Sequence, residues 1–259
     1  MRIASWNVNS VRQRLPHLLA YLKDAAPDVL CLQELKCENG AFPRQEVEDA
    51  GYNVAILGQK TFNGVALLSK APLEDIRTGL PGFEDVQSRY IEAAVADSAG
   101  GLYRIASIYL PNGNPVGSDK YPYKLAFMSA LAAHAAELLA AEERVVLAGD
   151  YNVIPAAADV YDPEGWKGDA LFLPQTRAKF RTLLNLGYVD ALRAVTDARQ
   201  QYTFWDYQAG AWQKNCGLRI DHLLLSPQAA DRLGSVAIDK SLRAGDKPSD
   251  HTPIRADFA

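Results

Sequence analysis

Polar residues recur along this chain directly after short apolar runs. The six cases are Asn7-Val8-Asn9, Gln33-Glu34, Tyr109-Leu110-Pro111-Asn112, Asp150-Tyr151-Asn152, Asp221-His222 and Asp250-His251. One carboxylate at the end of a strand is ordinary, whereas several carboxylates and amides at successive strand ends can converge on one edge of a fold. The pattern therefore indicates a polar site assembled from distant parts of the chain.

Oxygen donors dominate this set of residues. The carboxylates are Glu34, Asp150, Asp221 and Asp250, and the amides include Asn7 and Asn152. Such groups suit hard cations, and Mg²⁺ or Mn²⁺ are the expected cofactors. Magnesium usually takes one or two carboxylates, so the others can activate water or orient a histidine. Hydrolysis of a phosphoester needs charge neutralisation, a base and hydrogen-bond donors, and this set supplies all three.

Each of these residues also has an ordinary structural explanation when it is taken alone. Asn7 and Asn9 could be turn formers, and Glu34 could pair with Lys36 on the surface. The other structural alternatives are an Asx turn at Asp150 and Asn152, a helix cap at Ser249-Asp250, a half-buried aromatic Tyr109 and a surface pair Asp221-His222. Their joint occurrence in this order favours the functional interpretation.

The elements that must position these residues alternate between strands and helices. We expect strands at Arg2–Val8, Val29–Leu32, Val54–Leu57, Gly64–Ser69, Tyr90–Ala96, Tyr103–Leu110, Arg144–Ala148, Tyr202–Tyr207, Leu218–Leu225, Val236–Ile238 and Pro253–Phe258. Apolar periodicity predicts helices from Val11 to Leu22, from Pro122 to about Ala141, and over Arg177–Leu186 before Gly187. Hairpins mixed with helices predict an α/β (α+β) fold with two mixed or antiparallel sheets packed together and helices outside.

Length and composition limit the class of protein. The chain has 259 residues, of which 48% are hydrophobic, and it has no Ser/Gly linker, so we expect one domain spanning residues 1–259. No apolar run approaches the ~20 residues of a membrane span, and the first residues do not read as a signal peptide. We therefore expect a cytoplasmic protein without a membrane partner. Three irregularly spaced cysteines argue against disulfides and against a thiolate zinc site.

The net charge of −4 argues against a protein that coats nucleic acid without specificity. Local basic loops can still hold phosphates, so nucleic acid is not excluded as a substrate. No Gly-rich phosphate-binding fingerprint is present, so no nucleotide cofactor is expected.

Together, the motifs resemble the exonuclease III family, the bacterial abasic-site endonucleases of the endonuclease/exonuclease/phosphatase superfamily. The resemblance runs from residue 1 to the C-terminus and rests on Trp6-Asn7-Val8-Asn9-Ser10, Leu32-Gln33-Glu34, Gly64-Val65-Ala66, Tyr109-Leu110-Pro111-Asn112-Gly113, Gly149-Asp150-Tyr151-Asn152, Gly217-Leu218-Arg219-Ile220-Asp221 and Ser249-Asp250-His251. It implies a four-layered sandwich with the site at one end of the sheets.

The resemblance also implies the metal ligands. It makes Glu34 the main ligand, with Asn7 and Asp250 nearby. A second metal position at Asp150 and Asn152 is possible.

Catalytic roles follow from the same resemblance. Asp150 would be the general base for the attacking water, and Asn152 would position that water. His251, oriented by Asp221, would contact the phosphoryl oxygens, and Tyr109 would contact the phosphate or help the leaving oxygen. The implied reaction is metal-dependent hydrolysis of a DNA phosphodiester bond.

Duplex DNA with abasic sites or 3′ ends is the implied partner, and we expect the protein to act as a monomer. An abasic sugar has no base to stack, so flipping it out of the duplex is cheap. By similarity, Phe204, Leu218 and Ile220 would line a small apolar pocket for that sugar, with Asn112 and Lys120 as further substrate contacts. Relatives often have Trp at the position of Phe204 or Leu218. Since neighbouring strand residues face opposite ways, either Phe204 or Trp205 must be core.

The loop from Asn112 to Lys124 holds Asn, Gly, Tyr and Lys close to the expected site, and it is a candidate DNA contact. Further phosphate contacts could come from Lys36, Arg89 and Lys214.

Two other functions fit part of this pattern. A phosphoesterase of the superfamily could act on another substrate, although non-specific nucleases tend to carry a second catalytic His where Tyr109 stands. A catalytically inactive nucleic-acid-binding regulator could share the fold. The intact set of Glu34, Asp150, Asn152, Asp221, Asp250 and His251 argues against a regulator.

Overall fold

Two six-stranded β-sheets pack face to face in the computed structural model, which describes residues 1–259. The first sheet has the order β11-β12-β1-β2-β4-β3. Its strands are β1 (Arg2–Asn7), β2 (Val29–Gln33), β3 (Asn53–Leu57), β4 (Val65–Ser69), β11 (Leu233–Ile238) and β12 (Ile254–Phe258). The second sheet has the order β5-β6-β7-β8-β10-β9. Its strands are β5 (Glu74–Thr78), β6 (Tyr90–Ala96), β7 (Leu102–Tyr109), β8 (Arg144–Asp150), β9 (Val189–Asp190) and β10 (Asp221–Leu225).

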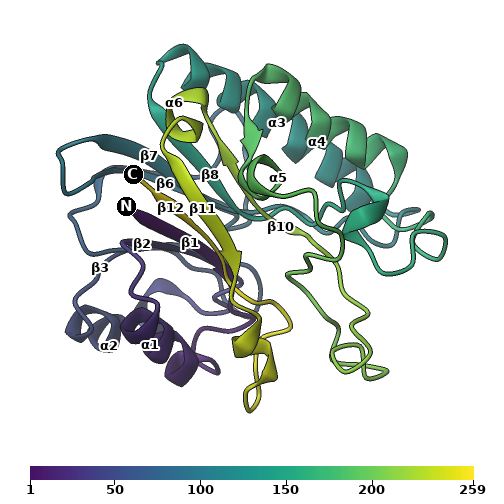
Figure 1. The fold of residues 1–259 in the computed structure, drawn as a ribbon, viewed down its shortest axis with the longest axis horizontal. Helices are drawn as coiled ribbons and strands as arrows, with labels where there is room; N and C mark the ends of the chain where they lie inside the picture. Colours follow the sequence, from purple (N-terminus) through teal and green to yellow (C-terminus); the bar gives the residue numbers. More distant parts are fainter.

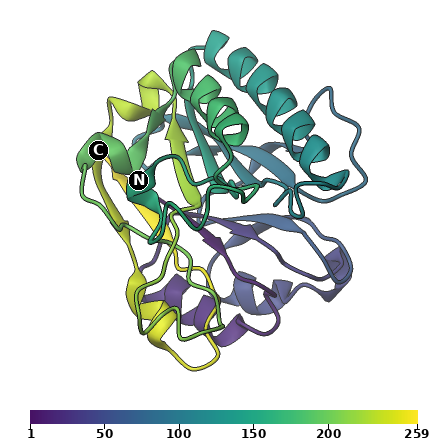
Figure 2. The ribbon, with the colours of Figure 1, turned by 90° about the vertical axis from the view of Figure 1, so that its right-hand side faces the viewer.

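Helices cover the outer face of each sheet, which gives the four layers that the sequence led us to expect (Figures 1 and 2). Helices α1 (Leu15–Asp24) and α2 (Arg44–Asp49) pack on the first sheet. Helices α3 (Lys120–Ala140) and α4 (Pro174–Leu186) pack on the second. Two shorter helices, α5 (Ala191–Val195) and α6 (Pro227–Ala230), contact the second sheet at β10. None of the helices combines the length and apolar character that a bilayer crossing requires.

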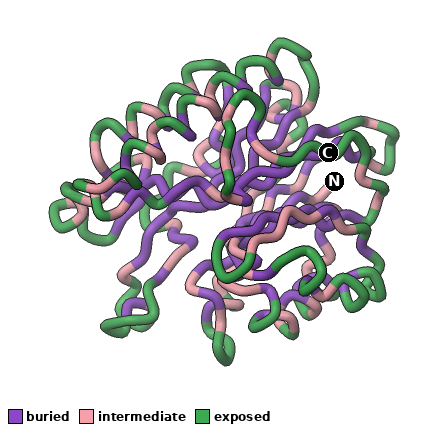
Figure 3. The backbone as a smooth tube through the Cα atoms, turned by 180° about the vertical axis from the view of Figure 1, so that it is seen from behind, coloured by how far each residue is buried: buried purple, intermediate pink, exposed green.

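The core follows from the alternation of side chains along the strands. Ile3, Val29, Ile105 and Val146 point between the two sheets and belong to the central cluster of 21 buried residues. Their neighbours point outward to the helices, so both faces of each sheet are apolar. Figure 3 shows the buried backbone concentrated in the strands, with exposed segments in loops and outer helical turns.

The strand register places the polar segments at one end of both sheets. Strand β1 is parallel to β2, and β7 is parallel to β8. The residues that follow these strands therefore emerge at the same edge. Strand β10 runs antiparallel to β8 with Asp221 opposite Asp150, so the start of β10 meets the end of β8.

The prediction of a strand over Tyr202–Tyr207 was wrong. This segment forms only single bridges, from Phe204 to Leu218 and to His251. The predicted strand Leu218–Leu225 is regular only from Asp221 onward. Both segments belong to loops around the polar edge, and Tyr202–Tyr207 bonds the segments around Leu218 and His251 instead of forming a continuous ladder.

Several short elements were not predicted. All five residues of β5 are exposed, so its sequence lacks the alternation that marks a half-buried strand. The remaining missed elements, α2, α5, α6 and β9, contain two to six residues each, too few for a periodic signal.

Candidate active site

Glu34 lies at the end of β2, where the backbone turns into the left-handed region with a φ of 53°. This conformation is uncommon for glutamate, and such backbone strain is concentrated at functional sites. One oxygen, Oε1, accepts a hydrogen bond from the Tyr109 hydroxyl at 2.8 Å. The other, Oε2, lies 2.8 Å from Lys36 Nζ. Burial opposes ionisation, but Lys36 and Asn7 outweigh it and hold the Glu34 pKa below its usual range. Glu34 therefore forms the ion pair with Lys36 that was considered as a structural alternative, and it also belongs to the larger polar cluster at this edge of the sheets.

The side chain of Asn7 joins Glu34 to Asp150. Its amide nitrogen donates to Glu34 Oε1 at 3.0 Å and to Asp150 Oδ2 at 2.9 Å. Its oxygen accepts from the Asn9 backbone N–H at 3.0 Å, as in a turn. In this arrangement Asn7 presents a donor to the two carboxylates instead of the ligand oxygen that the sequence led us to expect.

Asp150 is buried at the end of β8 and accepts a hydrogen bond from the Asn152 backbone N–H at 2.9 Å. This bond is the Asx turn considered as a structural alternative, so the turn and the site coexist. Burial raises the Asp150 pKa to about 7, and the negative charge of Asp221 adds to the effect although His251 opposes it. A carboxyl group with this pKa can accept a proton near neutral pH.

His251 is buried against Asp221. Its Nδ1 lies 2.9 Å from Asp221 Oδ2, which also accepts from the Thr203 hydroxyl at 2.6 Å. The other ring nitrogen, Nε2, lies 3.7 Å from Asp150 Oδ2. Burial lowers the His251 pKa, but Asp221 and Asp150 outweigh it and raise the pKa to about 10. The ring is thus held as an imidazolium, with Nε2 directed toward Asp150.

Two structural alternatives are excluded. Asp221 and His222 are both fully buried, so they are not a surface pair. Ser249 caps no helix, and its hydroxyl donates to the Asn7 carbonyl at 2.7 Å.

Potential ligand atoms of Glu34, Asp150 and His251 all lie within 4.8 Å of one another. Asp250 lies outside this group, and its Oδ1 accepts from Asn9 Nδ2 at 2.9 Å. A protonated imidazole has no lone pair for a metal, which leaves the two carboxylates as the anionic donors. The cluster could bind a metal ion, with oxygen donors of the kind that hard cations prefer.

Lys124 lies beneath the site, whereas the sequence analysis placed it at the end of a loop as a candidate DNA contact. It is fully buried in α3, and its Nζ donates to the backbone carbonyls of Asn112 at 3.0 Å and Asn152 at 2.5 Å. Burial lowers the Lys124 pKa to about 7. The available signal was its spacing, because Lys124 lies on the same helical face as the buried Tyr121 and Met128.

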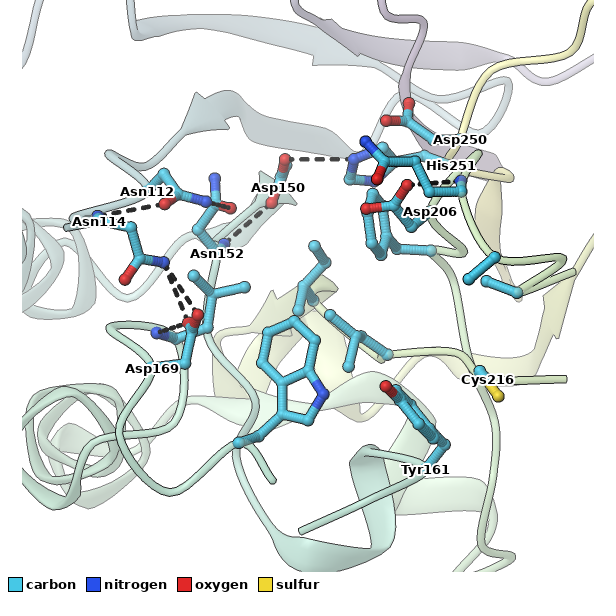
Figure 4. Close-up of a pocket in the computed structure, with 18 of the residues that line it drawn as sticks. Asn112, Asn114, Asp150, Asn152, Tyr161, Asp169, Asp206, Cys216, Asp250 and His251 are labelled. Atoms are coloured by element: carbon cyan, nitrogen blue, oxygen red, sulfur yellow. Dashed lines mark hydrogen bonds and ion pairs between the residues drawn. The ribbon is translucent and has the colours of Figure 1, made fainter. Parts of the chain in front are cut away.

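A cavity of about 740 Å³ opens beside the carboxylates (Figure 4). Phe204, Leu218 and Ile220 line it, as expected, and so does Asn112. Lys120 does not line it and is exposed at the start of α3. Trp205 is fully buried, whereas the Phe204 ring packs edge-on against the His251 ring with centroids 4.9 Å apart. The expectation that one of these two neighbours is core is therefore confirmed.

Of the further lining residues Asn114, Tyr161, Trp166 and Asp169, the sequence interpretation included only Asn114, within the candidate DNA-contact loop. The amide of Asn114 donates to both carboxylate oxygens of Asp169 at 3.1 Å, which joins two loops of the wall (Figure 4). Tyr161 and Trp166 complete the wall between these loops and the apolar residues. They lie in a loop without secondary-structure periodicity, so no sequence pattern marked them.

The sequence model of the endonuclease/exonuclease/phosphatase family matches residues 4–251. This chain belongs to that family. It is 35% identical to exodeoxyribonuclease III of Haemophilus influenzae over 267 aligned residues that cover 100% of both chains. The resemblance to the exonuclease III branch is thereby confirmed.

Solved structures give the same relationship. The 3′ phosphatase NExo from Neisseria, bound to a product DNA hairpin, superposes with a TM-score of 0.96 and 39% identity, covering 100% of this chain and 99% of that one. An AP endonuclease from Archaeoglobus fulgidus superposes with a TM-score of 0.94 and 36% identity, with the same coverage. The fold of this family member is therefore that of the exonuclease III and AP endonuclease structures.

Proposed function

We propose that this chain is a DNA repair nuclease of the exodeoxyribonuclease III kind that depends on Mg²⁺. It would hydrolyse the phosphodiester bond on the 5′ side of an abasic site and trim 3′ ends of duplex DNA. The observation that carries the proposal is the cluster of Glu34, Asp150 and His251 beside an apolar cavity. Relatives named as exodeoxyribonuclease III and as AP endonuclease support the substrate class.

The donor set fits a divalent ion. Glu34 is ionised because its pKa lies below its usual range, so it is the preferred ligand. Asp150 and Asp221 add negative charge to a buried region, which favours a cation there. When bound, Mg²⁺ would neutralise charge on the scissile phosphate and orient it.

The side chains of the protein would supply the remaining catalytic roles. Asp150, with a pKa of about 7, would accept a proton from the attacking water. The imidazolium of His251 would donate from Nε2 to a phosphoryl oxygen, held in that orientation by Asp221. Asn152 would position the water, because Asn112 and Lys124 fix its side chain and its carbonyl. Tyr109, whose hydroxyl contacts Glu34, lies within the same cavity and would contact the phosphate.

Water would attack phosphorus and break its bond to the 3′ oxygen. The products would be a 3′-hydroxyl on the upstream strand and a 5′-phosphate on the abasic residue. The apolar wall of Phe204, Leu218 and Ile220 would receive the flipped sugar.

The test compares a duplex carrying one abasic analogue with the intact duplex, each with Mg²⁺ and with chelator. We expect cutting 5′ to the analogue only with the metal, and a loss of activity in Asp150→Asn with the melting temperature retained. If the wild-type protein leaves the abasic duplex uncut with every divalent metal supplied, the proposal is wrong and a binding role becomes the alternative.

A further inference from the structure

Trp166 differs from the other three tryptophans of the chain. Trp6 packs against Tyr21, and Trp205 packs against both Tyr202 and Trp212. Trp166 is in none of the packed aromatic pairs of the molecule, is half-buried, and lines the active-site cavity. A large aromatic ring that faces a cavity without an aromatic partner is available for stacking.

Tyr161 adds a second aromatic side chain to the same wall. It is 44% exposed and lines the cavity away from Asp150 and His251 (Figure 4). Beside the catalytic groups stands Phe204, whose ring packs edge-on against His251. The cavity therefore has an apolar part at Phe204, next to His251, and an aromatic part at Tyr161 and Trp166.

The loop that carries Trp166 is anchored at both ends. Tyr161 N–H donates to the Gly217 carbonyl at 3.2 Å, and Asp169 is held by Asn114. Within the loop, Trp166 N–H donates to the Asp162 carbonyl at 3.3 Å, and its own carbonyl accepts from Asp169 N–H at 3.0 Å. The aromatic wall is thus fixed relative to the catalytic residues before substrate binds.

An abasic sugar does not require this outer wall. The cavity volume of about 740 Å³ exceeds what a deoxyribose ring fills, and a sugar has no flat face for an indole. A nucleobase has such a face, and base–aromatic stacking contributes substantially to the binding of single-stranded nucleic acid whatever the base. The combined volume and chemistry of the wall match a nucleotide that still carries its base.

We infer that Trp166 and Tyr161 form a stacking site for the base of the 3′-terminal nucleotide that the enzyme removes. This inference rests on the proposed function, since it places that nucleotide on the 3′ side of the scissile phosphate. Hydrolysis would break the bond between phosphorus and the 3′ oxygen of the preceding nucleotide and release a nucleoside 5′-monophosphate. The stacking site would allow the same pocket to bind an intact 3′-terminal nucleotide for removal.

The kinetic test uses two duplexes that differ only at the 3′ terminus, one ending in dA and one in a tetrahydrofuran abasic analogue. We expect Trp166→Ala to lower kcat/KM for the dA terminus on the order of 10- to 100-fold, as loss of one stacked base implies. The abasic terminus should change less than about twofold, and Trp166→Phe should restore most of the dA activity. Trp212→Phe, outside the cavity, is the control for loss of an indole.

A binding measurement separates this inference from the proposed function. In chelator, titration with dAMP and with deoxyribose 5-phosphate gives the contribution of the base without turnover. We expect the wild-type protein to prefer dAMP, and Trp166→Ala to lose that preference. Equal affinities in the wild-type protein, failure to bind either ligand, or an unchanged preference in Trp166→Ala would overturn the stacking site. Cutting of the internal abasic duplex tests the proposed function separately, whatever the outcome for the stacking site.

Discussion

The carboxylate of Asp221 lies 2.9 Å from Nδ1 of the buried His251 and holds the ring as an imidazolium whose Nε2 points toward Asp150. The two residues are 30 positions apart in the chain, and they meet where Asp221 begins β10 of one sheet and His251 precedes β12 of the other. This pair fixes both the charge and the direction of the only histidine in the cavity.

Asp221→Asn should inactivate the enzyme through His251. Without the anion the His251 pKa falls, so the ring no longer offers a cationic donor at neutral pH. We expect kcat to fall by about 10²- to 10⁴-fold, with a lower melting temperature because a buried charge loses its partner. Thr203→Val is the matched control, since it removes the hydroxyl that donates to Asp221 Oδ2 and accepts from the Ile220 and Asp221 N–H groups, but keeps the charge of Asp221. A kcat within about threefold of wild type in Asp221→Asn, measured below its melting temperature, would contradict this role.

Glu34→Gln should weaken metal binding more than folding. The substitution keeps the size of the side chain and its contact with Tyr109 but removes the charge that attracts a cation. We expect the Mg²⁺ concentration for half-maximal activity to rise at least tenfold. Glu46→Gln, an exposed change in the first turn of α2, should leave the metal titration unaltered. An unchanged titration in Glu34→Gln would remove Glu34 as the main ligand.

Lys124→Met should lower turnover without much effect on substrate affinity. The ammonium holds the carbonyls of Asn112 and Asn152, and Asn152 has a left-handed backbone with a φ of 47°. Loss of this clamp should let Asn152 move by a few tenths of an ångström and lower kcat roughly 10- to 100-fold, an effect expected for small misplacements. The kinetic split between kcat and KM is the measurement. Lys179→Met is the control, because Lys179 is half-buried on α4 and bonds only the Ser129 hydroxyl, away from the site. A rise in KM at constant kcat would instead make Lys124 a substrate contact.

His222 should make the protein less stable in mild acid. Its Nε2 hydrogen-bonds the Val153 carbonyl and its Nδ1 faces Arg219 at 3.1 Å, so the folded state needs the neutral ring. Burial and the Arg219 charge lower the His222 pKa to about 4, against about 6.5 in the unfolded chain.

Between these two values only the unfolded chain takes up the His222 proton, so the contribution of His222 to the free energy of unfolding should fall as the pH drops from about 6.5 to 4. The loss should approach roughly 3 kcal/mol. The raised pKa of Asp150 acts in the opposite sense over this range, so the effect of His222 is read as the difference from a His222 variant. Urea unfolding across this range is the measurement. His222→Gln should lack this contribution when its curve is compared with that of the wild-type protein, whereas His17→Gln should keep it. Parallel wild-type and His222→Gln curves in this window would show that His222 titrates normally.

Much of the strand and helix pattern was predictable because it rests on local periodicity. The prediction of a strand over Tyr90–Ala96 is confirmed to the residue, since its apolar run and the turn after it are local signals. The end of α4 before Gly187 was predicted because a φ of 125° there favours glycine. The segment Tyr202–Tyr207 looked like a strand but is a loop, because its apolar side chains are buried against other loops without a neighbouring strand to pair with.

The sequence by itself determined which chemical groups stand after which strands, since residue type and strand ends are properties of the local chain. It therefore supplied Glu34, Asp150, Asp221 and His251 and the expectation of an oxygen-rich site. Only the tertiary structure decided which groups face one another: the amide of Asn7 toward two carboxylates, Lys124 under the site, Asp250 outside the cluster, and Trp166 in the wall of the cavity. Those relationships depend on strand order, register and side-chain direction. These arise from packing between segments far apart in the chain, as in the contact of Asn9 with Asp250, which are 241 positions apart.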